Sequence, residues 1–267
     1  MTYKYTDYHI HTANWSTDVG EDGPNFYDYI KVAEINRINI CFLEHFELYH
    51  IESDKSNPFY KGGIQNYLEE IDTLKETYDS ILGGLEIQYY RDRETELLEF
   101  FDDYGKELDF ISGSMHEWIF KYPITTRKSL LKFLEKKSVK EIVDEYFKIS
   151  KTMINSGIFK NICHLDTIFR FINDNDIKPT EDCDTSDNRV LDLGRLCIKN
   201  KIAIEYNLSG LKFPINRPFP SKEVVTLLKR EGASFFVGSD SHSLDYFENK
   251  IPKIEEAYNF LSSIKNI

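Results

Sequence analysis

Short segments rich in β-branched and aromatic residues alternate seven times with longer segments of helical periodicity along this chain. The expected strands cover residues 3–10, 38–43, 80–87, 109–114, 159–164, 202–207 and 234–238. The expected helices lie near residues 26–37, 64–79, 94–106, 127–155, 187–200, 221–231 and 251–264. Regular alternation of strands and helices predicts an α/β fold with a parallel sheet, either closed into a barrel or doubly wound.

The length of the chain, 267 residues, lies within the range of one α/β barrel. No low-complexity segment, long linker or close internal repeat divides it, so we expect residues 1–267 to form a single domain. The polar segment 170–189 follows an expected strand and predicts a long loop. In barrels of this kind such loops build the active site at the carboxyl ends of the strands.

The charge of the chain argues against one broad class of partner. Lys and Arg total 33 against 45 Asp and Glu, which gives a net charge of −12. A chain this acidic is not expected to bind nucleic acid through a broad basic face. A small anionic substrate would need local positive charge, supplied by arginines or by metal ions.

The apolar residues and the cysteines predict a cytoplasmic protein. No stretch approaches the roughly 18 apolar residues of a membrane span, and the N-terminus lacks the apolar segment of a signal peptide. The four cysteines are scattered without a CxxC pair, which favours reduced thiols over a zinc ribbon or a disulfide framework. We expect no membrane partner, and the sequence predicts no particular oligomeric state.

The distribution of histidines is the strongest functional signal. Six of the seven histidines lie at or just beyond the carboxyl end of an expected strand: His9, His11, His45, His116, His164 and His242. The third expected strand ends instead at Glu86. In a parallel barrel these strand ends meet at one rim. Because alternate residues of a strand point to the same side, His9 and His11 can reach one ion together.

Each of these residues has an ordinary alternative role. A histidine can sit half-buried at a strand end, Glu86 can cap a helix, and Asp240 can be a turn residue. Together they would bring too many polar groups to one place without a partner. Borderline cations favour imidazole mixed with carboxylate, so we predict a cluster of two or three divalent ions, of zinc, manganese or iron.

The residues around these positions resemble the polymerase-and-histidinol-phosphatase superfamily. The motifs, in chain order, are Asp7-Tyr-His-Ile-His-Thr, Leu43-Glu-His, Gly84-Leu-Glu, Gly113-Ser-Met-His, Cys163-His-Leu-Asp and Gly238-Ser-Asp-Ser-His. They run through nearly the whole chain. The resemblance implies a distorted (β/α)7 barrel of parallel strands with the metal site at its C-terminal rim.

The same resemblance implies three metal positions. The first ion would be held by His9, His11, Glu86 and Asp240. The second would be held by His116 and His164, with Glu86 as a bridging carboxylate. The third would be held by His45 and His242 with one residue of the loop after the first strand.

The third position departs from the family pattern. Many members of the family place a histidine in that loop, whereas this chain has none between His11 and His45. Asp18 is the natural substitute. The substitution leaves the affinity and the metal identity of the third site open.

A cluster of this kind fits hydrolysis of a phosphate ester. Two ions about 4 Å apart can clamp a phosphoryl oxygen and generate hydroxide at neutral pH. Our hypothesis is direct attack of a metal-bound hydroxide on phosphorus, because the chain has neither a CxxxxxR loop nor a DxDxT-like nucleophile motif. Glu86 and His116 would act as ligands of the reacting ions, and either Asp240 or a metal-bound water would protonate the leaving group.

The positive charge and donors that bind the phosphate are expected on the rim loops, from Arg170, Arg217 and Ser114. For each arginine the alternative is an ordinary solvated surface residue.

The substrate is predicted from resemblance alone. The segment Glu205-Tyr-Asn-Leu-Ser-Gly-Leu, followed by Arg217-Pro-Phe-Pro, resembles the monofunctional histidinol-phosphate phosphatases. It implies hydrolysis of L-histidinol phosphate to L-histidinol and phosphate in histidine biosynthesis.

Two kinds of alternative remain. One is a different enzyme on the same scaffold: a nuclease, a phosphodiesterase or another small-molecule phosphatase. The other is a metal-binding regulatory module without catalysis. The acidic charge weighs against a nuclease that acts on long polymers. Every expected ligand position is filled, which favours an enzyme over a regulatory module.

Overall fold

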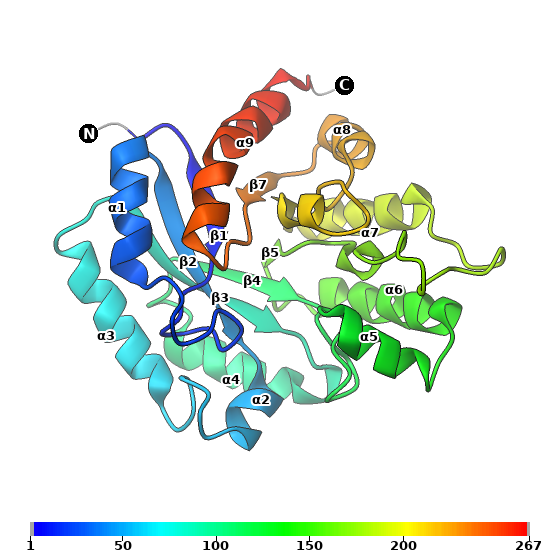
Figure 1. Cartoon of the computed structure of the whole chain (residues 1–267), viewed down its shortest axis with the longest axis horizontal. Coiled ribbons are helices and arrows are strands. Elements are labelled where there is room, and N and C mark those ends of the chain that lie inside the picture. Colours follow the sequence, from blue (N-terminus) through cyan, green and yellow to red (C-terminus); the bar gives the residue numbers. More distant parts are fainter. Residues whose placement is uncertain (1–2, 266–267) are drawn as a thin grey trace. The chain divides into compact units, whose positions relative to one another are not determined.

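The computed structural model describes residues 3–265, and its strands form one sheet in the order β1-β2-β3-β4-β5-β6-β7 (Figure 1). The strands are β1 (Thr6–Ile10), β2 (Asn39–Phe46), β3 (Ile81–Gln88), β4 (Phe110–Ser114), β5 (Asn161–Ile162), β6 (Ala203–Asn207) and β7 (Phe235–Gly238). The pairs β1–β2, β2–β3, β4–β5 and β5–β6 are parallel.

Helices connect the successive strands. The α-helices are α1 (Phe26–Asn36), α2 (Leu48–Ser53), α3 (Gly63–Lys75), α4 (Glu94–Tyr104), α5 (Arg127–Leu134), α6 (Val139–Asn155), α7 (Asp187–Asn200), α8 (Lys222–Arg230) and α9 (Leu244–Ser263). Three short 3-10 helices are η1 (Arg91–Arg93), η2 (Thr167–Phe169) and η3 (Ser209–Lys212).

Two compact units make up the chain, and each combines separate stretches of sequence. Of the described residues, 3–87, 95–112 and 237–260 form unit 1, whereas 88–94, 113–236 and 261–265 form unit 2. The expectation of a single domain stays a prediction.

Unit 1 contains β1, β2 and most of β3. The register of β2 and β3 places His45 opposite Glu86. A parallel bridge between Ile10 and Ser241 brings the segment after β7 beside the end of β1. Helix α1 covers β2, and its buried Phe26 packs edge-on against Phe42 with ring centroids 4.5 Å apart. The strand pairing and this bridge place the carboxyl ends of β1, β2 and β3 beside the segment after β7.

Unit 2 contains β5 and β6 with the end of β4. Gly113 pairs with Ile162, and Asn161 pairs with Ala203. Gly113 has no room for a side chain, because a Cβ atom there would lie 2.8 Å from the ring of Phe159. Helices α6 and α7 lie side by side within this unit (Figure 1).

The predicted fold class is confirmed, since seven strands alternate with helices in a sheet of sequential order. Each expected strand lies at its predicted place, although β5 is shorter than expected.

Two helix predictions were wrong, and one short helix was missed. The helix expected over 127–155 is two helices, because Ser138 caps a new helix in a reciprocal pair of hydrogen bonds with Glu141. The short helix α2 was not predicted, and no side chain caps its start. Helix α9 begins at Leu244 rather than near residue 251 and continues through Pro252.

Among the described residues, no helix combines the length and the apolar character needed to cross a membrane. All four cysteines are free and buried.

Candidate functional site

Unit 1 gathers most of the predicted metal ligands at the carboxyl ends of its strands. They come from the ends of β1, β2 and β3, from the loop after β1 and from the segment after β7: His9, His11, Asp18, His45, Glu86, Asp240 and His242. His9, His11 and Glu86 are fully or almost fully buried, and Asp240 is 8% exposed. The side chains of His45, His242 and Asp18 are partly exposed.

The buried members of this group face one another at the spacing of ligands around one ion. His9 Nε2 lies 2.9 Å from His11 Nε2 and 3.3 Å from Glu86 Oε2. Asp240 Oδ1 lies 3.9 Å from His9 Nε2 and 3.6 Å from His11 Nε2. Ligand atoms arranged tetrahedrally at about 2.1 Å from a zinc ion are about 3.4 Å apart. This set of nitrogen and oxygen donors therefore fits a divalent cation.

A second group in unit 1 contains the predicted replacement for the family histidine. Asp18 Oδ2 lies 3.3 Å from His45 Nε2 and 3.0 Å from His242 Nε2. His45 Nδ1 lies 3.1 Å from Glu86 Oε2, so Glu86 is close to both groups. The ring of His11 stacks on that of His45 with centroids 4.2 Å apart. The structure thus brings Asp18 to the two histidines with which it was predicted to share an ion.

The pKa values of two histidines in these groups are shifted in opposite directions. Burial, reinforced by the neighbouring His45 and His242, holds the pKa of His11 well below its ordinary value, so its ring is neutral. Burial lowers the pKa of His45, but Asp18 and Glu86 outweigh it and raise that pKa well above the ordinary value. Metal binding to such a histidine would release a proton.

Asp18 is ionised for a related reason. Desolvation raises its pKa, but the stronger attraction to His45 and His242 holds the pKa well below its ordinary value. Because 51% of the Asp18 side chain is exposed, solvent screens part of this attraction.

Asp240 is held in an unusual backbone conformation. Its φ of +57° lies in the left-handed region, and its N–H donates to the carbonyl of His9 at 2.9 Å. The buried Asp7 Oδ1 accepts the N–H groups of His9 (3.1 Å) and Ser239 (2.8 Å). Burial raises the pKa of Asp7 to about 6. Asp7 therefore fastens β1 to the segment that carries Asp240.

Unit 2 holds a smaller group with two of the predicted ligands. His116 follows β4 and His164 follows β5, and their Nε2 atoms are 3.3 Å apart. The N–H of His116 donates to Gln88 Oε1 at 2.6 Å, and the N–H of His164 donates to the buried Glu205 at 2.8 Å. His164 has a φ of +23°. Strained backbone of this kind is stored preferentially at functional sites.

Arg217 is the more accessible of the two predicted phosphate-binding arginines. Its Nη2 lies 2.8 Å from Asp166 Oδ2, with the carboxylate fully buried and 22% of the arginine side chain exposed. Antiparallel hydrogen bonds between Asn207 and Phe219, at 2.8 and 2.9 Å, fold the loop of Arg217 back on β6. Burial raises the pKa of Asp166, and Arg217 opposes that rise.

Arg170 donates its hydrogen bonds to other groups of the protein. Its side chain is 6% exposed, and its Nη1 donates to the carbonyl of Thr125 at 2.8 Å. Its Nε and Nη2 both donate to Thr167 Oγ1, and its guanidinium lies 4.5 Å from the ring centroid of Phe213. This arrangement makes Arg170 a fastening between loops of unit 2.

Ser114, the third predicted phosphate contact, ends β4. Its hydroxyl is buried and has no hydrogen-bond partner in the described part of the chain. An unsatisfied buried hydroxyl costs free energy, so a bound polar group that accepts its proton would stabilise it.

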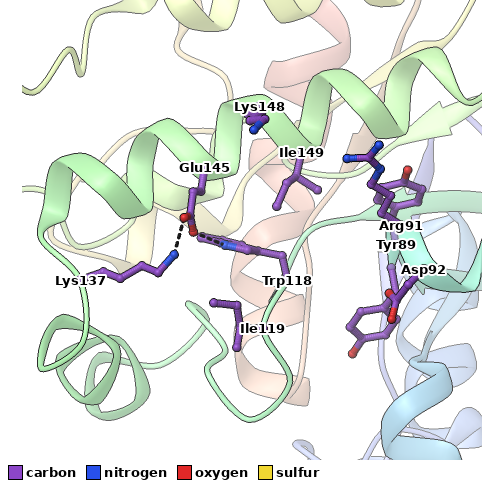
Figure 2. Close-up of a pocket in the computed structure, with 10 residues that line it drawn as sticks. Tyr89, Arg91, Asp92, Trp118, Ile119, Lys137, Glu145, Lys148 and Ile149 are labelled. Atoms are coloured by element: carbon purple, nitrogen blue, oxygen red, sulfur yellow. Dashed lines mark hydrogen bonds and ion pairs between the residues drawn. The ribbon is translucent and has the colours of Figure 1, made fainter.

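A cavity of about 330 Å³ lies in unit 2 beside the segment that follows His116 (Figure 2). Trp118 Nε1 donates to Glu145 Oε2 at 2.9 Å, and Lys137 pairs with the same carboxylate. Figure 2 shows these three side chains converging, Trp118 from the loop after β4, Lys137 from the segment before α6 and Glu145 from α6 itself. The loop that carries His116 is thereby tied to α6.

Five buried polar residues that support the site were not predicted from the sequence: Asp7, Glu44, Gln88, Asp166 and Glu205. Asp7, Glu44, Asp166 and Glu205 lie within the motifs or segments that carry the resemblance. For Asp7, Glu44 and Glu205, the available signal was a charged residue inside an otherwise apolar strand segment, because such residues are seldom buried without a partner.

Comparison with known proteins finds relatives of similar sequence. No family model matches the chain. It is 25% identical over 196 residues to the histidinol-phosphatase of Bacillus subtilis (strain 168), a match that covers 65% of this chain and 70% of that protein. It is 23% identical over 188 residues to the probable histidinol-phosphatase of Deinococcus radiodurans. That match covers 67% of this chain and 65%, slightly under two thirds, of the relative.

Two solved structures share the fold. The putative histidinol phosphatase hisK from Listeria monocytogenes superimposes with a TM-score of 0.73 at 19% identity, over 90% of this chain and 96% of that one. The histidinol phosphate phosphatase from Lactococcus lactis subsp. lactis Il1403, complexed with zinc, L-histidinol and phosphate, gives a TM-score of 0.74 at 21% identity. That match covers 100% of this chain and 95% of the other. The two structures show a shared fold, and the names of the two relatives agree with the family that the motifs resemble.

Proposed function

We propose that this chain is a metal-dependent phosphomonoesterase that hydrolyses L-histidinol phosphate to L-histidinol and phosphate in the cytoplasm. The observation that carries the proposal is the ligand group of unit 1, where His9, His11, Glu86 and Asp240 converge at metal-ligand spacing. The substrate is supported by the relatives, two of which are named histidinol-phosphatases. A solved structure of the same fold contains zinc, L-histidinol and phosphate.

The proposal assigns ligands to as many as three ions. His9, His11, Glu86 and Asp240 would hold one, and Asp18, His45 and His242 would hold another; both sets lie within unit 1. His116 and His164 of unit 2 would hold a further ion. The resemblance gives that ion Glu86 as its carboxylate, and we keep this assignment as part of the proposal.

Bound divalent cations would polarise the phosphoryl oxygens and supply a strong nucleophile at neutral pH. Residues of the protein would bind and orient the phosphate. Arg217, oriented by the buried Asp166, would donate charge-assisted hydrogen bonds to the phosphate. The Ser114 hydroxyl would donate to another phosphate oxygen.

The leaving group of a phosphate monoester needs a proton. Asp240 is our candidate to hold that proton, because its carboxylate is almost buried yet within 3.6 Å of a neighbouring imidazole. Arg170 has a supporting role in this proposal, since its donors already bind Thr125 and Thr167.

The test is phosphate release from a panel of esters by the purified protein, with and without a chelator. L-histidinol phosphate is compared with p-nitrophenyl phosphate and with bis(p-nitrophenyl) phosphate, a diester. We expect chelator-sensitive release with a preference for L-histidinol phosphate. Equal rates on both monoesters would reject the substrate assignment, and faster release from the diester would favour a phosphodiesterase.

A further inference from the structure

Glu44 is a buried carboxylate without a predicted role, and it receives several donors from the adjacent turn. It lies in β2 next to His45 and is fully buried. Thr12 donates to it from its hydroxyl at 2.7 Å and from its N–H, which is 3.1 and 3.2 Å from the two oxygens. Ser16 donates its hydroxyl proton to Glu44 Oε2 at 2.5 Å.

The Ser16 hydroxyl stands between this carboxylate and a candidate metal ligand. Ser16 Oγ lies 3.2 Å from His11 Nδ1, on the side of the ring away from the ligand group. A hydroxyl has one proton, and the Ser16 hydroxyl donates it to Glu44 Oε2. Because that proton is used in the hydrogen bond to Glu44, Ser16 Oγ accepts from His11, and His11 Nδ1 therefore carries the ring proton.

We infer that Glu44 is a positioning residue that fixes the tautomer of His11 through Ser16. A neutral imidazole has one N–H, so a proton on Nδ1 leaves Nε2 with a free lone pair. That Nε2 atom faces His9 Nε2 at 2.9 Å and Asp240 Oδ1 at 3.6 Å. Glu44 thereby presents the metal-binding nitrogen of His11 in its binding form, as carboxylates behind metal-bound histidines do.

The same carboxylate fastens the turn that carries Asp18. The N–H of Ser16 donates to the carbonyl of Thr12 at 2.9 Å, and the N–H of Val19 donates to the carbonyl of Ser16 at 3.2 Å. Asp18 lies inside the second of these turns. Glu44 therefore acts on both ligand groups of unit 1. The inference rests on the proposed function only for the identity of the ligand, a divalent cation.

Glu44→Gln is the variant that separates positioning from packing. It keeps the shape of the side chain and replaces one oxygen by an NH2 group. Glu44 Oε1 accepts two Thr12 donors within 3.1 Å, so the remaining oxygen should stay there and the NH2 should face Ser16. Ser16 would then accept from this NH2 group and donate to His11 Nδ1, which moves the ring proton to Nε2.

Thr12→Val is the matched control. It removes one hydrogen bond to the same carboxylate and preserves the shape of the side chain. It leaves the links from Glu44 to Ser16 and from Ser16 to His11 intact. If the role of Glu44 were only to stabilise the turn, the two variants would behave alike.

The readout is the tautomer of His11 in metal-free protein with 15N-labelled histidine, measured by proton–nitrogen correlation at pH 8.5 and assigned by loss of the signal in His11→Gln. We expect an Nδ1–H ring in the wild type and in Thr12→Val, and an Nε2–H ring in Glu44→Gln. An Nε2–H ring in the wild type, or an unchanged ring in Glu44→Gln, would overturn the inference. Should Glu44→Gln fail to fold, Ser16→Ala should abolish the preference for Nδ1–H, and a retained preference would also overturn it.

A zinc titration of the metal-free proteins supplies a second readout. We expect Glu44→Gln to weaken zinc binding about 10- to 100-fold, and Thr12→Val to weaken it less than about threefold. Equal losses in both variants would mean that Glu44 only stabilises the turn. If the tautomer changes in Glu44→Gln as expected while the wild type releases no phosphate from L-histidinol phosphate, the proposed function is rejected and this inference stands.

Discussion

The two units carry different functional side chains. Unit 1 contributes seven ligand-type side chains that lie close together, four imidazoles and three carboxylates: His9, His11, His45, His242, Asp18, Glu86 and Asp240. Unit 2 contributes two imidazoles, an arginine paired with a buried carboxylate and a buried serine hydroxyl. Unit 1 is therefore built mainly to hold cations, and unit 2 is better suited to hold the anion.

The two units also differ in how buried polar residues hold the functional side chains in place. In unit 1 the supporting carboxylates Asp7 and Glu44 accept from backbone N–H groups and hydroxyls close to the ligands. In unit 2, Gln88 and Glu205 hold the backbone of the two histidines, whereas Asp166 holds a side chain, that of Arg217. Loss of a unit 1 residue should thus change metal content, and loss of Arg217 should change substrate binding alone.

The largest effect is expected from His9→Ala. His9 is fully buried among the other ligands, and its loss should remove at least one equivalent of metal and lower turnover by more than about 100-fold. The measurements are metal analysis and steady-state kinetics. His50→Ala is the control, because that histidine lies in α2 near Glu47, outside both ligand groups, and should leave both quantities unchanged. Full metal content in His9→Ala would contradict the assignment of cation binding to unit 1.

The next effect is expected from Arg217→Ala. An arginine that binds phosphate by charge-assisted hydrogen bonds contributes about 1.5–3 kcal/mol, so the Michaelis constant for L-histidinol phosphate should rise roughly 10- to 150-fold. Metal content should not change. Arg195→Ala is the matched control, because Arg195 forms an exposed ion pair with Glu231. If the Michaelis constant rose in Arg170→Ala and not in Arg217→Ala, the buried Arg170 would be the residue that binds the phosphate.

The smallest effect is expected from Asp18→Ala. Asp18 is half exposed and serves one group of unit 1, so its loss should weaken one metal position by about tenfold and leave the fold intact. Activity should fall together with metal content and recover when metal is added in excess. Asp22→Ala, in the same loop, is the control. Unchanged stoichiometry and rates would mean that Asp18 is an ordinary loop residue.

The sequence predicted the strand ends well because a strand buried on both faces reads as an apolar run with a sharp polar end. That is why Glu86 was placed correctly within its strand and Asp240 just after its strand. The end of β2 was predicted too early, at residue 43, because the strand continues to Phe46 and contains His45. The sequence could not predict the break before Ser138, since residues on both sides of the break have helical periodicity.

The supporting residues of the site were harder to predict for a different reason. Glu44 accepts from residues 28 and 32 positions away, and Asp7 accepts from Ser239, which lies 232 positions away. Such partners are set by the tertiary fold, so a single sequence gives no spacing that reveals them. The tertiary fold also decides that Arg170 is buried and donates to Thr125, whereas Arg217 is partly exposed and pairs with Asp166. The sequence alone could not distinguish these two environments.

The central claim is that the protein binds a cluster of divalent cations and needs it for phosphate release. Metal analysis of protein purified from metal-replete medium, paired with phosphate release from L-histidinol phosphate before and after chelation, tests it most directly. We predict at least two divalent cations per chain, loss of phosphate release on chelation and recovery when the metal is restored. Less than one equivalent of metal, with phosphate release that survives chelation, would contradict the account.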